Sequence, residues 1–395
     1  MHKIAIVVAK RSAIASFGGS LSQASAVYIS AQIARECCKN LLPQAVIVGN
    51  VIGANHGQNL ARQIALEAHF PLDTPSYCVN KVCGSGLKAI ELACLEISTG
   101  NYELVLAGGV EFLSQAPFYL SACSRFSGLK LGDSLLKDAI LRDGLEDAFE
   151  GTLMGLTAEE LASRYEISRE EQDDFALISQ TRAAQAWQNG YFSQEVVPLK
   201  ITKGRQQFVF ERDEHIREDS TREKLAKLKS PFKEHGSVTA GNSSGINDGV
   251  AFVLLASEKK VRELKLQVLA WIEGFASVGL QPRLMGLGPV EATRKLLGRL
   301  SWSFKDLKHI ELNEAFAAQS LAVIKEWQKS YSYVDKSCIN PQGGAIALGH
   351  PLGATGARLV VTLAHAMNRQ ALRKGLATLC IGGGQGMAVA LSADK

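Results

Sequence analysis

The sequence lacks long apolar runs, a strong excess of one charge and any Cys-x-x-Cys pair. No apolar stretch approaches the roughly 20 residues that a membrane-spanning helix needs. The net charge is only +4, from 43 basic and 39 acidic side chains, which is too weak to indicate a nucleic acid or a membrane surface as partner. We therefore expect a soluble protein that binds neither.

The eight cysteines are scattered, and Cys37 and Cys38 are adjacent, which is poor geometry for a disulfide or a shared metal ion. Secreted disulfide scaffolds are shorter and denser in cysteine, so we expect a reducing, cytoplasmic setting, mostly buried structural cysteines and no metal site. Residues 1–8 predict a strand and not a signal peptide, and the last five residues match no retention or peroxisomal tripeptide.

The chain has 395 residues, of which 46% are hydrophobic. This length and composition suit two or three domains or subdomains. Over residues 1–115, strand-like and helix-like stretches alternate, and the uninterrupted apolar strands predict a sheet covered on both faces. Residues 116–250 are more polar and include a helical pattern that opens on a capping box, Ser168 with Glu171. We interpret this segment as an inserted loop domain.

Residues 251–395 return to the first pattern and contain an internal echo. The stretch from Cys78 leads through a Gly-Ser-Gly turn into a helix and then a strand, 103–107, which ends at two glycines. The stretch from Cys338 leads through Gly353-Ala-Thr-Gly into a helix and then a strand, 377–381, which ends at three glycines. The echo predicts an α/β fold of two similar halves, with the insertion in the first.

Cys83 lies between a predicted strand and a predicted helix, flanked by Gly84 and Gly86. A helix N-terminus presents unpaired N–H groups and the positive end of the dipole, so we expect a lowered thiol pKa and a raised thiolate fraction. The glycines permit a tight turn and a close approach of substrate. The pattern is typical of a nucleophile elbow with cysteine for serine; the alternative is a structural cysteine in a glycine-rich turn.

His350 and Cys380 also lie in glycine-lined contexts. His350 precedes Pro351, which disfavours the α region for it, and is either a candidate base or a loop histidine with a structural hydrogen bond. Cys380 ends a predicted strand before glycines 382–384, whose N–H groups could hold a phosphate or an oxyanion, although the run matches no nucleotide-binding fingerprint. Together these residues predict thiol chemistry and not nucleotide redox chemistry.

Two further features allow both a functional and a structural interpretation. Asn313 follows a predicted strand, 309–312, and opens a predicted helix, 314–325, so it either caps that helix or holds a water or a substrate carbonyl in a cleft. The segment 203–233 is dense in charge. Its basic side chains form either a solvated face or a surface for the phosphates of a nucleotide-like carrier.

These pieces resemble the thiolase family, and specifically its acetyl-CoA acetyltransferase branch, nearly from end to end. The motifs occur in one order: Val79-Asn-Lys-Val-Cys83-Gly-Ser-Gly, Gly108-Gly-Val-Glu, Met154-Gly-Leu-Thr-Ala-Glu, Gly236-Ser-Val-Thr-Ala-Gly-Asn-Ser-Ser244, Asn313-Glu-Ala-Phe316, Gly343-Gly-Ala-Ile-Ala-Leu-Gly-His350-Pro and Cys380-Ile-Gly-Gly-Gly. The resemblance implies a duplicated five-layered α-β-α-β-α fold whose inserted loop domain binds coenzyme A. It implies no cofactor, because the coenzyme A thioesters are substrates.

The resemblance also implies roles. Cys83 would carry an acyl group as a thioester, His350 would activate Cys83 and later the thiol of coenzyme A, and Cys380 would move the α-proton of acetyl-CoA. The N–H groups of Cys83 and Gly382 would form one oxyanion hole, and His350 with a water on Asn313 the other. Residues at positions implied to bind substrate or coenzyme A are Arg217, Ser244, Met154, Leu153 and Phe316. The implied reaction is reversible, with two acetyl-CoA giving acetoacetyl-CoA and free CoA.

One position departs from the family pattern. Acetoacetyl-specific members carry His immediately before the Met-Gly of the loop, whereas this chain has Leu153, so a broader 3-ketoacyl-CoA thiolase of fatty-acid β-oxidation stays open. A ketoacyl synthase would not need Cys380, and a nicotinamide dehydrogenase would need an acidic residue after a proper fingerprint. The resemblance further implies a homodimer or homotetramer.

Overall fold

The computed structural model describes residues 3–129 and 131–393. Its core is a large mixed sheet of ten strands. The strands are β1 (Ile4–Arg11), β2 (Ala15–Ser16), β3 (Ala45–Gly49), β4 (Ser76–Val79), β5 (Leu104–Phe112), β10 (Asn247–Ser257), β11 (Ala270–Gly279), β12 (His309–Leu312), β13 (Lys374–Ile381) and β14 (Gln385–Ser392). Their order is β12-β13-β14-β11-β1-β10-β5-β3-β4, and β2 pairs with β10 off this path.

The two halves of the sheet repeat one pattern. In the first half β3 is parallel to β5, and β5, β10 and β1 follow as antiparallel neighbours. In the second half β12 is parallel to β13, and β13, β14 and β11 follow in the same way. The parallel pairing of β4 with β3 has a counterpart in a bridge between Ile310 and Ile339. The halves join where β1 pairs with β11, so the echo seen in the sequence is a duplicated fold.

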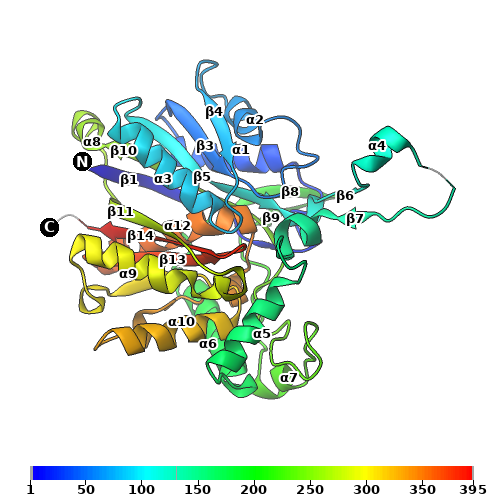
Figure 1. Ribbon diagram of the computed structural model, residues 1–395. Coiled ribbons are helices and arrows are strands. Elements are labelled where there is room, and N and C mark those ends of the chain that lie inside the picture. The colour runs from blue at the N-terminus through cyan, green and yellow to red at the C-terminus, as the bar shows by residue number, and fades with distance from the viewer. Residues whose placement is uncertain (1–2, 130, 394–395) are drawn as a thin grey trace.

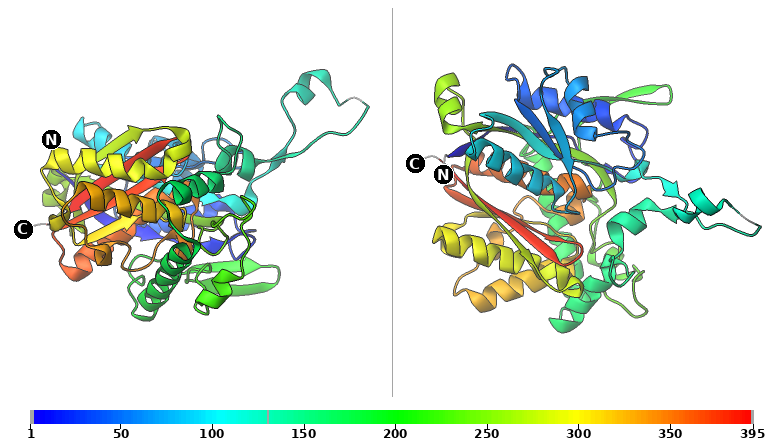
Figure 2. Two further views of the ribbon diagram at one scale, coloured as in Figure 1. Left: turned by 60° about the horizontal axis from the view of Figure 1, so that its bottom comes forward. Right: turned by 45° about the horizontal axis from the view of Figure 1, so that its top comes forward.

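Helices complete five layers (Figures 1 and 2). They are α1 (Ala26–Cys38), α2 (Leu60–Glu67), α3 (Ser85–Ser98), α8 (Glu258–Leu264), α9 (Gly288–Leu300), α10 (Ala317–Ser330), α11 (Ala345–Leu348) and α12 (Leu352–Gln370). α3 and α12 pack against each other between the two halves of the sheet. α1 and α2 cover the outer face of one half, and α9 and α10 that of the other. α12 is buried over residues 352–367, as a central layer requires.

The glycines at 108 and 109 lie inside β5, where the sequence predicted a strand that ends at residue 107. That prediction of the strand end was wrong because the glycines serve packing and not a turn. A Cβ at Gly108 would lie 2.0 Å from the carbonyl oxygen of Ala251 in β10. A Cβ at Gly109 would lie 2.0 Å from the carbonyl oxygen of Gly353 in α12. Both neighbours therefore pack directly on the backbone of β5.

The segment between β5 and β10 forms the insertion. Its elements are β6 (Phe118–Tyr119), α4 (Cys123–Ser127), β7 (Lys137–Asp138), the π-helical turn Ile140–Leu145, α5 (Met154–Arg164), α6 (Arg169–Gln188), β8 (Leu199–Lys203), β9 (Gln206–Phe210) and α7 (Arg222–Ala226). The predicted capping box at Ser168 is confirmed. The Ser168 side chain accepts from the N–H of Glu171, and the Glu171 carboxylate accepts from the N–H of Ser168. β6, α4 and β7 form an arm that projects from the body (Figure 1).

Short 3-10 turns connect the remaining elements, at Leu113–Gln115, Pro282–Leu287, Phe304–Asp306 and Lys336–Cys338. α5 and α6 pack against α10, which places these two helices beside the second half of the sheet. β8 and β9 pack with the apolar core of the first half. Among the described residues, no helix has both the length and the apolarity to cross a membrane.

Candidate active site

Cys83 lies in the turn between β4 and α3, as predicted. The residue before it, Val82, has a φ of 48°, a left-handed conformation that is strained for a β-branched side chain. Ser85 holds the turn, because its Oγ donates to the carbonyl of Val82 at 2.7 Å and accepts from the N–H of Lys81 at 2.8 Å. The Cys83 sulfur lies next to the backbone N–H of Gly382, in the second half of the fold.

Burial raises the pKa of the Cys83 thiol to about 11, against the smaller effect of backbone N–H groups of Gly382 and of Cys83 itself, which lower it. The sequence predicted a lowered pKa, and that prediction was wrong. Cys83 precedes the N-cap residue, Gly84, and although the residue as a whole is only half-buried, protein atoms surround its sulfur. Desolvation therefore outweighs the helix terminus, and the resting group is a thiol.

A hydrogen bond from one ring nitrogen to Thr355 orients the His350 side chain. Its Nδ1 lies 2.6 Å from Oγ1 of Thr355, and that hydroxyl also lies 2.9 Å from the carbonyl oxygen of Pro351, to which it donates. A hydroxyl has one proton, so we assign the hydrogen between His350 and Thr355 to Nδ1. Nε2 then carries the lone pair, and it has no hydrogen-bond partner among the described residues.

Burial, with a smaller contribution from the charge of Arg358, lowers the pKa of His350 to about 3. The residue is 4% exposed. The imidazole is therefore neutral at physiological pH and oriented with Nε2 free, which is the form that a general base requires. The interpretation of His350 as a candidate base fits this geometry, while a structural hydrogen bond occupies its other nitrogen.

Cys380 is the penultimate residue of β13 and is 1% exposed. Burial raises its pKa strongly, and the neighbouring sulfur of Cys83 raises it further. The strand then passes into Gly382, whose N–H reaches the Cys83 thiol. A Cβ at Gly84 would meet the Ile381 side chain, so the strand end of one half touches the elbow of the other. Both cysteines and the glycine run thus converge on one point.

Asn313 follows β12 but caps no helix. α10 begins at Ala317 with Phe316 as its N-cap, so the predicted helix start and the capping interpretation were wrong. The backbone of 315–317 instead bonds the facing loop, since the N–H of Ser244 donates to Ala315 and the N–H of Ala317 donates to Asn242. Asn313 is fully buried, and neither polar atom of its side chain has a partner within the described chain. Buried amides are nearly always bonded, which favours the alternative of a group that meets a ligand or a water.

A cavity of about 420 Å³ opens beside Cys83. Val82 and Gly382, from the two converging segments, line it. The rest of its wall includes Val51–Ala54, the π-helical turn with Arg142 and Asp143, and the side chain of Met154. Its volume lies within the ordinary range of small-molecule sites. Within residues 3–129 and 131–393, no three His, Cys, Asp or Glu side chains are placed to hold a metal ion.

The other predicted binding residues fall into two places. Met154 and Phe316 pack against the apolar cluster that contains Cys380, and Leu153 is half-buried as the N-cap of α5. Ser244 is tied to the Asn313 loop through its N–H. Arg217 lies farther out, exposed on a cavity along α6, with its N–H donated to Gln180 at 2.8 Å.

The sequence did not predict two residues that have a clear place in the site. Glu111 is buried in β5, and its carboxylate accepts from the N–H groups of Val51, Ile52 and Gly353 at 2.7 to 3.1 Å. It thereby joins the cavity wall to the start of α12. The Gly-Gly-Val-Glu motif contained it, but nothing in that motif indicated its partners. Thr355, which orients His350, had no signal beyond its position in a glycine-rich stretch.

Comparison with known proteins gives a consistent result. Residues 4–259 match the model of the thiolase N-terminal domain, and residues 266–393 that of the thiolase C-terminal domain. The chain is 47% identical to an acetyl-CoA acetyltransferase of Chromobacterium violaceum, over 98% of this chain and 99% of that one. It is 46% identical to a probable acetyl-CoA acyltransferase of Staphylococcus aureus over the full length of both.

Solved structures agree with the sequence relatives. The fold is similar to the Bacillus anthracis acetyl-CoA acetyltransferase, with a TM-score of 0.96, 43% identity and coverage of 100% of this chain and 99% of that one. It is also similar to the human mitochondrial 3-ketoacyl-CoA thiolase, with a TM-score of 0.94, 39% identity and the same coverage. The chain therefore belongs to the thiolase family and is an acyltransferase.

Proposed function

We propose that this thiolase transfers an acyl group between acyl-CoA and acetyl-CoA, through a thioester on Cys83, by reversible Claisen condensation and thiolysis. The observation that carries the proposal is the convergence of the Cys83 and Cys380 thiols with the N–H of Gly382 in one buried place. The oriented lone pair of His350 supports it, because His350 lies two residues before Leu352, whose cluster also contains Cys83. The unpartnered amide of Asn313 supports it. Relatives named for transfer to or from acetyl-CoA support coenzyme A thioesters as the substrates.

In thiolysis, Nε2 of His350 takes the Cys83 proton as the sulfur adds to the 3-keto carbon of the substrate. The N–H groups of Cys83 and Gly382 stabilise the oxyanion. The bond between carbons 2 and 3 then breaks, the acyl group stays on sulfur, and the electron pair goes to the departing acetyl-CoA. The protonated His350 and Asn313 stabilise the enolate oxygen, and the Cys380 thiol gives its proton to carbon 2.

The second half-reaction returns every proton. The proton on His350 first passes to the Cys380 thiolate. Nε2 of His350 then takes the thiol proton of coenzyme A, whose sulfur attacks the thioester and displaces Cys83. Cys83 leaves as a thiolate and recovers that proton from His350. The raised pKa of the Cys380 thiol suits this order of proton transfers, because Cys380 must be protonated when the enolate forms.

The test separates the two cysteines. With Cys380→Ser, acetyl-CoA should still acetylate Cys83, but the α-carbon cannot be deprotonated and the adduct should accumulate. With Cys83→Ala, no adduct and no turnover are expected. Peptide mass spectrometry after incubation with acetyl-CoA locates the label, with the parent enzyme as control. A label on any residue other than Cys83, or substantial turnover by Cys83→Ala, contradicts the proposal.

A second candidate, a broader 3-ketoacyl-CoA thiolase, is favoured by the cavity and by Leu153. The cavity of about 420 Å³ beside Cys83 is larger than an acetyl group requires. Thiolysis of acetoacetyl-CoA and of a longer 3-ketoacyl-CoA should be compared for the parent and for Leu153→His. If acetyl transfer is the preferred reaction, kcat/KM is higher for acetoacetyl-CoA in the parent. Preference for the longer chain, lost in Leu153→His, establishes the broader activity.

We further propose that coenzyme A binds along the insertion, near Ser244 and Arg217. The imidazole of His215, two residues before Arg217, lies against Gly245, the residue after Ser244, and this contact supports the proposal. The charge of an arginine suits the phosphates of coenzyme A. Arg217→Ala should therefore raise KM for coenzyme A thioesters with little change in kcat, and an unchanged KM would exclude this contact.

We also propose that the chain assembles as a homotetramer or homodimer. Two features support this. The arm of β6, α4 and β7 exposes large apolar side chains, including Phe118, Phe126 and Leu135. The edge strand β4 leaves one side of its backbone open to pairing and exposes Tyr77. Exposed apolar patches and open edges mark interaction surfaces.

A further inference from the structure

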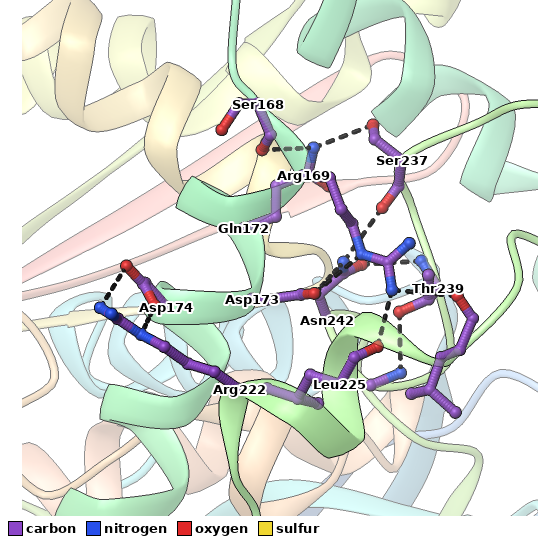
Figure 3. A network of polar contacts seen from close by, with 12 residues as sticks. Ser168, Arg169, Gln172, Asp173, Asp174, Arg222, Leu225, Ser237, Thr239 and Asn242 are labelled. Carbon is purple, nitrogen blue, oxygen red and sulfur yellow. Dashed lines mark hydrogen bonds and ion pairs between the residues drawn. The ribbon is translucent and has the colours of Figure 1, made fainter.

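A chain of buried polar contacts joins α6 to the loop 237–244 (Figure 3). Arg169 Nε donates to one carboxylate oxygen of Asp173 at 2.8 Å, and Asn242 Nδ2 donates to the other at 2.9 Å. The Asn242 amide also donates to the carbonyl of Ser237, and its Oδ1 accepts from the N–H of Thr239 at 2.8 Å. Asp173 is 5% exposed and Asn242 is fully buried.

The backbone of the same loop is bonded to the segment that follows Asn313. The carbonyl of Asn242 accepts from the N–H of Ala317 at 2.8 Å, and Ser244 donates to the carbonyl of Ala315 at 3.0 Å. Ser243 and Phe316 form an antiparallel bridge between these two bonds. These bonds hold the two loops against each other, and the side chain of Asn242 bonds the backbone of its own loop at Ser237 and Thr239.

The other end of the chain of contacts reaches the charged segment. Arg169 Nη2 donates to the carbonyls of Leu225 and Leu228 at 2.7 and 3.0 Å. Leu225 lies in α7, and Lys224, Lys227 and Lys229 are its neighbours in sequence. A single set of contacts thus extends from the basic residues of the insertion, through Asp173 and Asn242, to the segment after Asn313.

We propose that Asn242 is a positioning residue, which holds the loop with Ser244 and the loop with Asn313 in one arrangement through its bond to Asp173. The inference rests on the proposed function, since it links the coenzyme A region to the reacting atoms. An amide is required at position 242 because it must donate to a carboxylate and accept from a backbone N–H at the same time. An aspartate of the same shape can only accept.

The sharpest variant is Asn242→Asp, which keeps the shape and places a second carboxylate against Asp173. The double variant Asp173→Asn with Asn242→Asp exchanges the partners. The amide at 173 can then accept from Arg169 and donate to residue 242, which still accepts from Thr239 but no longer donates to the carbonyl of Ser237. Asp174→Asn is the matched control, because it makes the same substitution one residue away, in an exposed pair with Arg222.

Two measurements are made on the full-length enzyme at pH 8. Steady-state thiolysis of acetoacetyl-CoA gives kcat and KM separately, and amide hydrogen exchange reports on the peptide that covers 313–318. In Asn242→Asp we expect kcat/KM to fall at least about ten-fold, because a buried bond is replaced by like charges. KM should rise and kcat should fall together, and the 313–318 amides should exchange faster. The double variant should recover part of the lost kcat/KM, because it restores the bond between positions 173 and 242 but not the bond to Ser237, and Asp174→Asn should match the parent.

Different outcomes refute different statements. If the parent does not catalyse thiolysis, the proposed function is wrong, and the exchange of 313–318 still decides the inference. If the parent is active and Asn242→Asp behaves like it in both measurements, the inference is wrong. A double variant that is no more active than Asn242→Asp also overturns it. Should Asn242→Asp fail to fold, Asp173→Asn alone removes the charged acceptor; unchanged kinetics and exchange in that variant refute the inference.

Discussion

At the scale of single residues, burial sets the protonation of Cys83 and His350. The pKa of Cys83 is raised to about 11 and that of His350 is lowered to about 3, so both the thiol and the imidazole are neutral before substrate binds. The glycine contexts made both residues candidates from sequence. Their pKa values could not be predicted, because desolvation comes from segments far apart in the chain that pack around them.

The protonation of Cys83 has a measurable consequence. Only the thiolate reacts with iodoacetamide, and with a pKa of about 11 its population rises about ten-fold per pH unit across pH 6 to 9.5. We expect the alkylation rate of the Cys83 peptide, followed by mass spectrometry, to increase through this whole range without a plateau. A plateau below pH 9 would show a stabilised thiolate, as the helix terminus alone predicts. Glutathione, alkylated under the same conditions, is the control.

The orientation of His350 depends on Thr355. Thr355→Val keeps the shape of the side chain but removes the acceptor for Nδ1–H, which leaves that donor buried and allows the other tautomer. We expect kcat for thiolysis to fall about ten-fold or more, as for other partners that orient a functional histidine. Thr293→Val is the control, because the Thr293 hydroxyl is buried without a partner among the described residues. Equal activity of the two variants would contradict this role.

At the scale of elements, the pattern of apolar residues predicted the strands well where the local sequence alone determines the bounds. The strands 45–49 and 309–312 were predicted at their observed bounds. The errors occurred where a tertiary contact decides. α10 starts late because the backbone of 315–317 bonds the loop 242–244, and β5 continues through its glycines because β10 and α12 approach closely. Neither contact partner is near in sequence.

The close approach of α12 to β5 predicts the effect of a single methyl group. Gly109→Ala would put a Cβ 2.0 Å from the carbonyl oxygen of Gly353, so α12 must shift, and His350 at its start must shift with it. We expect a loss of stability of about 2 kcal/mol or more together with reduced kcat. Gly298→Ala, in α9, meets no described atom within 4 Å and should stabilise by about 0.5–1 kcal/mol. Thermal unfolding and thiolysis assays distinguish the two, and a neutral Gly109→Ala would refute the packing argument.

At the scale of the whole molecule, the duplication explains why the site lies where it does. The end of β13 in the second half touches the turn after β4 in the first half, so Cys83 from the first half meets Cys380 and Gly382 from the second. The sequence echo predicted the two halves, and the common strand order confirms them. What the echo could not predict is the arm, because an excursion from the body has no counterpart in the second half, and most of its large apolar side chains are exposed and leave no buried pattern.

The arm is the surface that we propose holds copies of the chain together. Phe126 is 88% exposed and Leu135 is 81% exposed, and a monomer would leave both in water at a cost that assembly removes. Phe126→Ser combined with Leu135→Ser should therefore shift the proposed assembly toward smaller species while the thermal unfolding of the subunit fold stays close to that of the parent. Light scattering coupled to size exclusion measures the mass. Val209→Ser, at an exposed position of β9, is the control and should leave the mass unchanged. If the arm variant keeps the mass of the parent, the arm does not hold the assembly together, and the open edge of β4 becomes the surface to test.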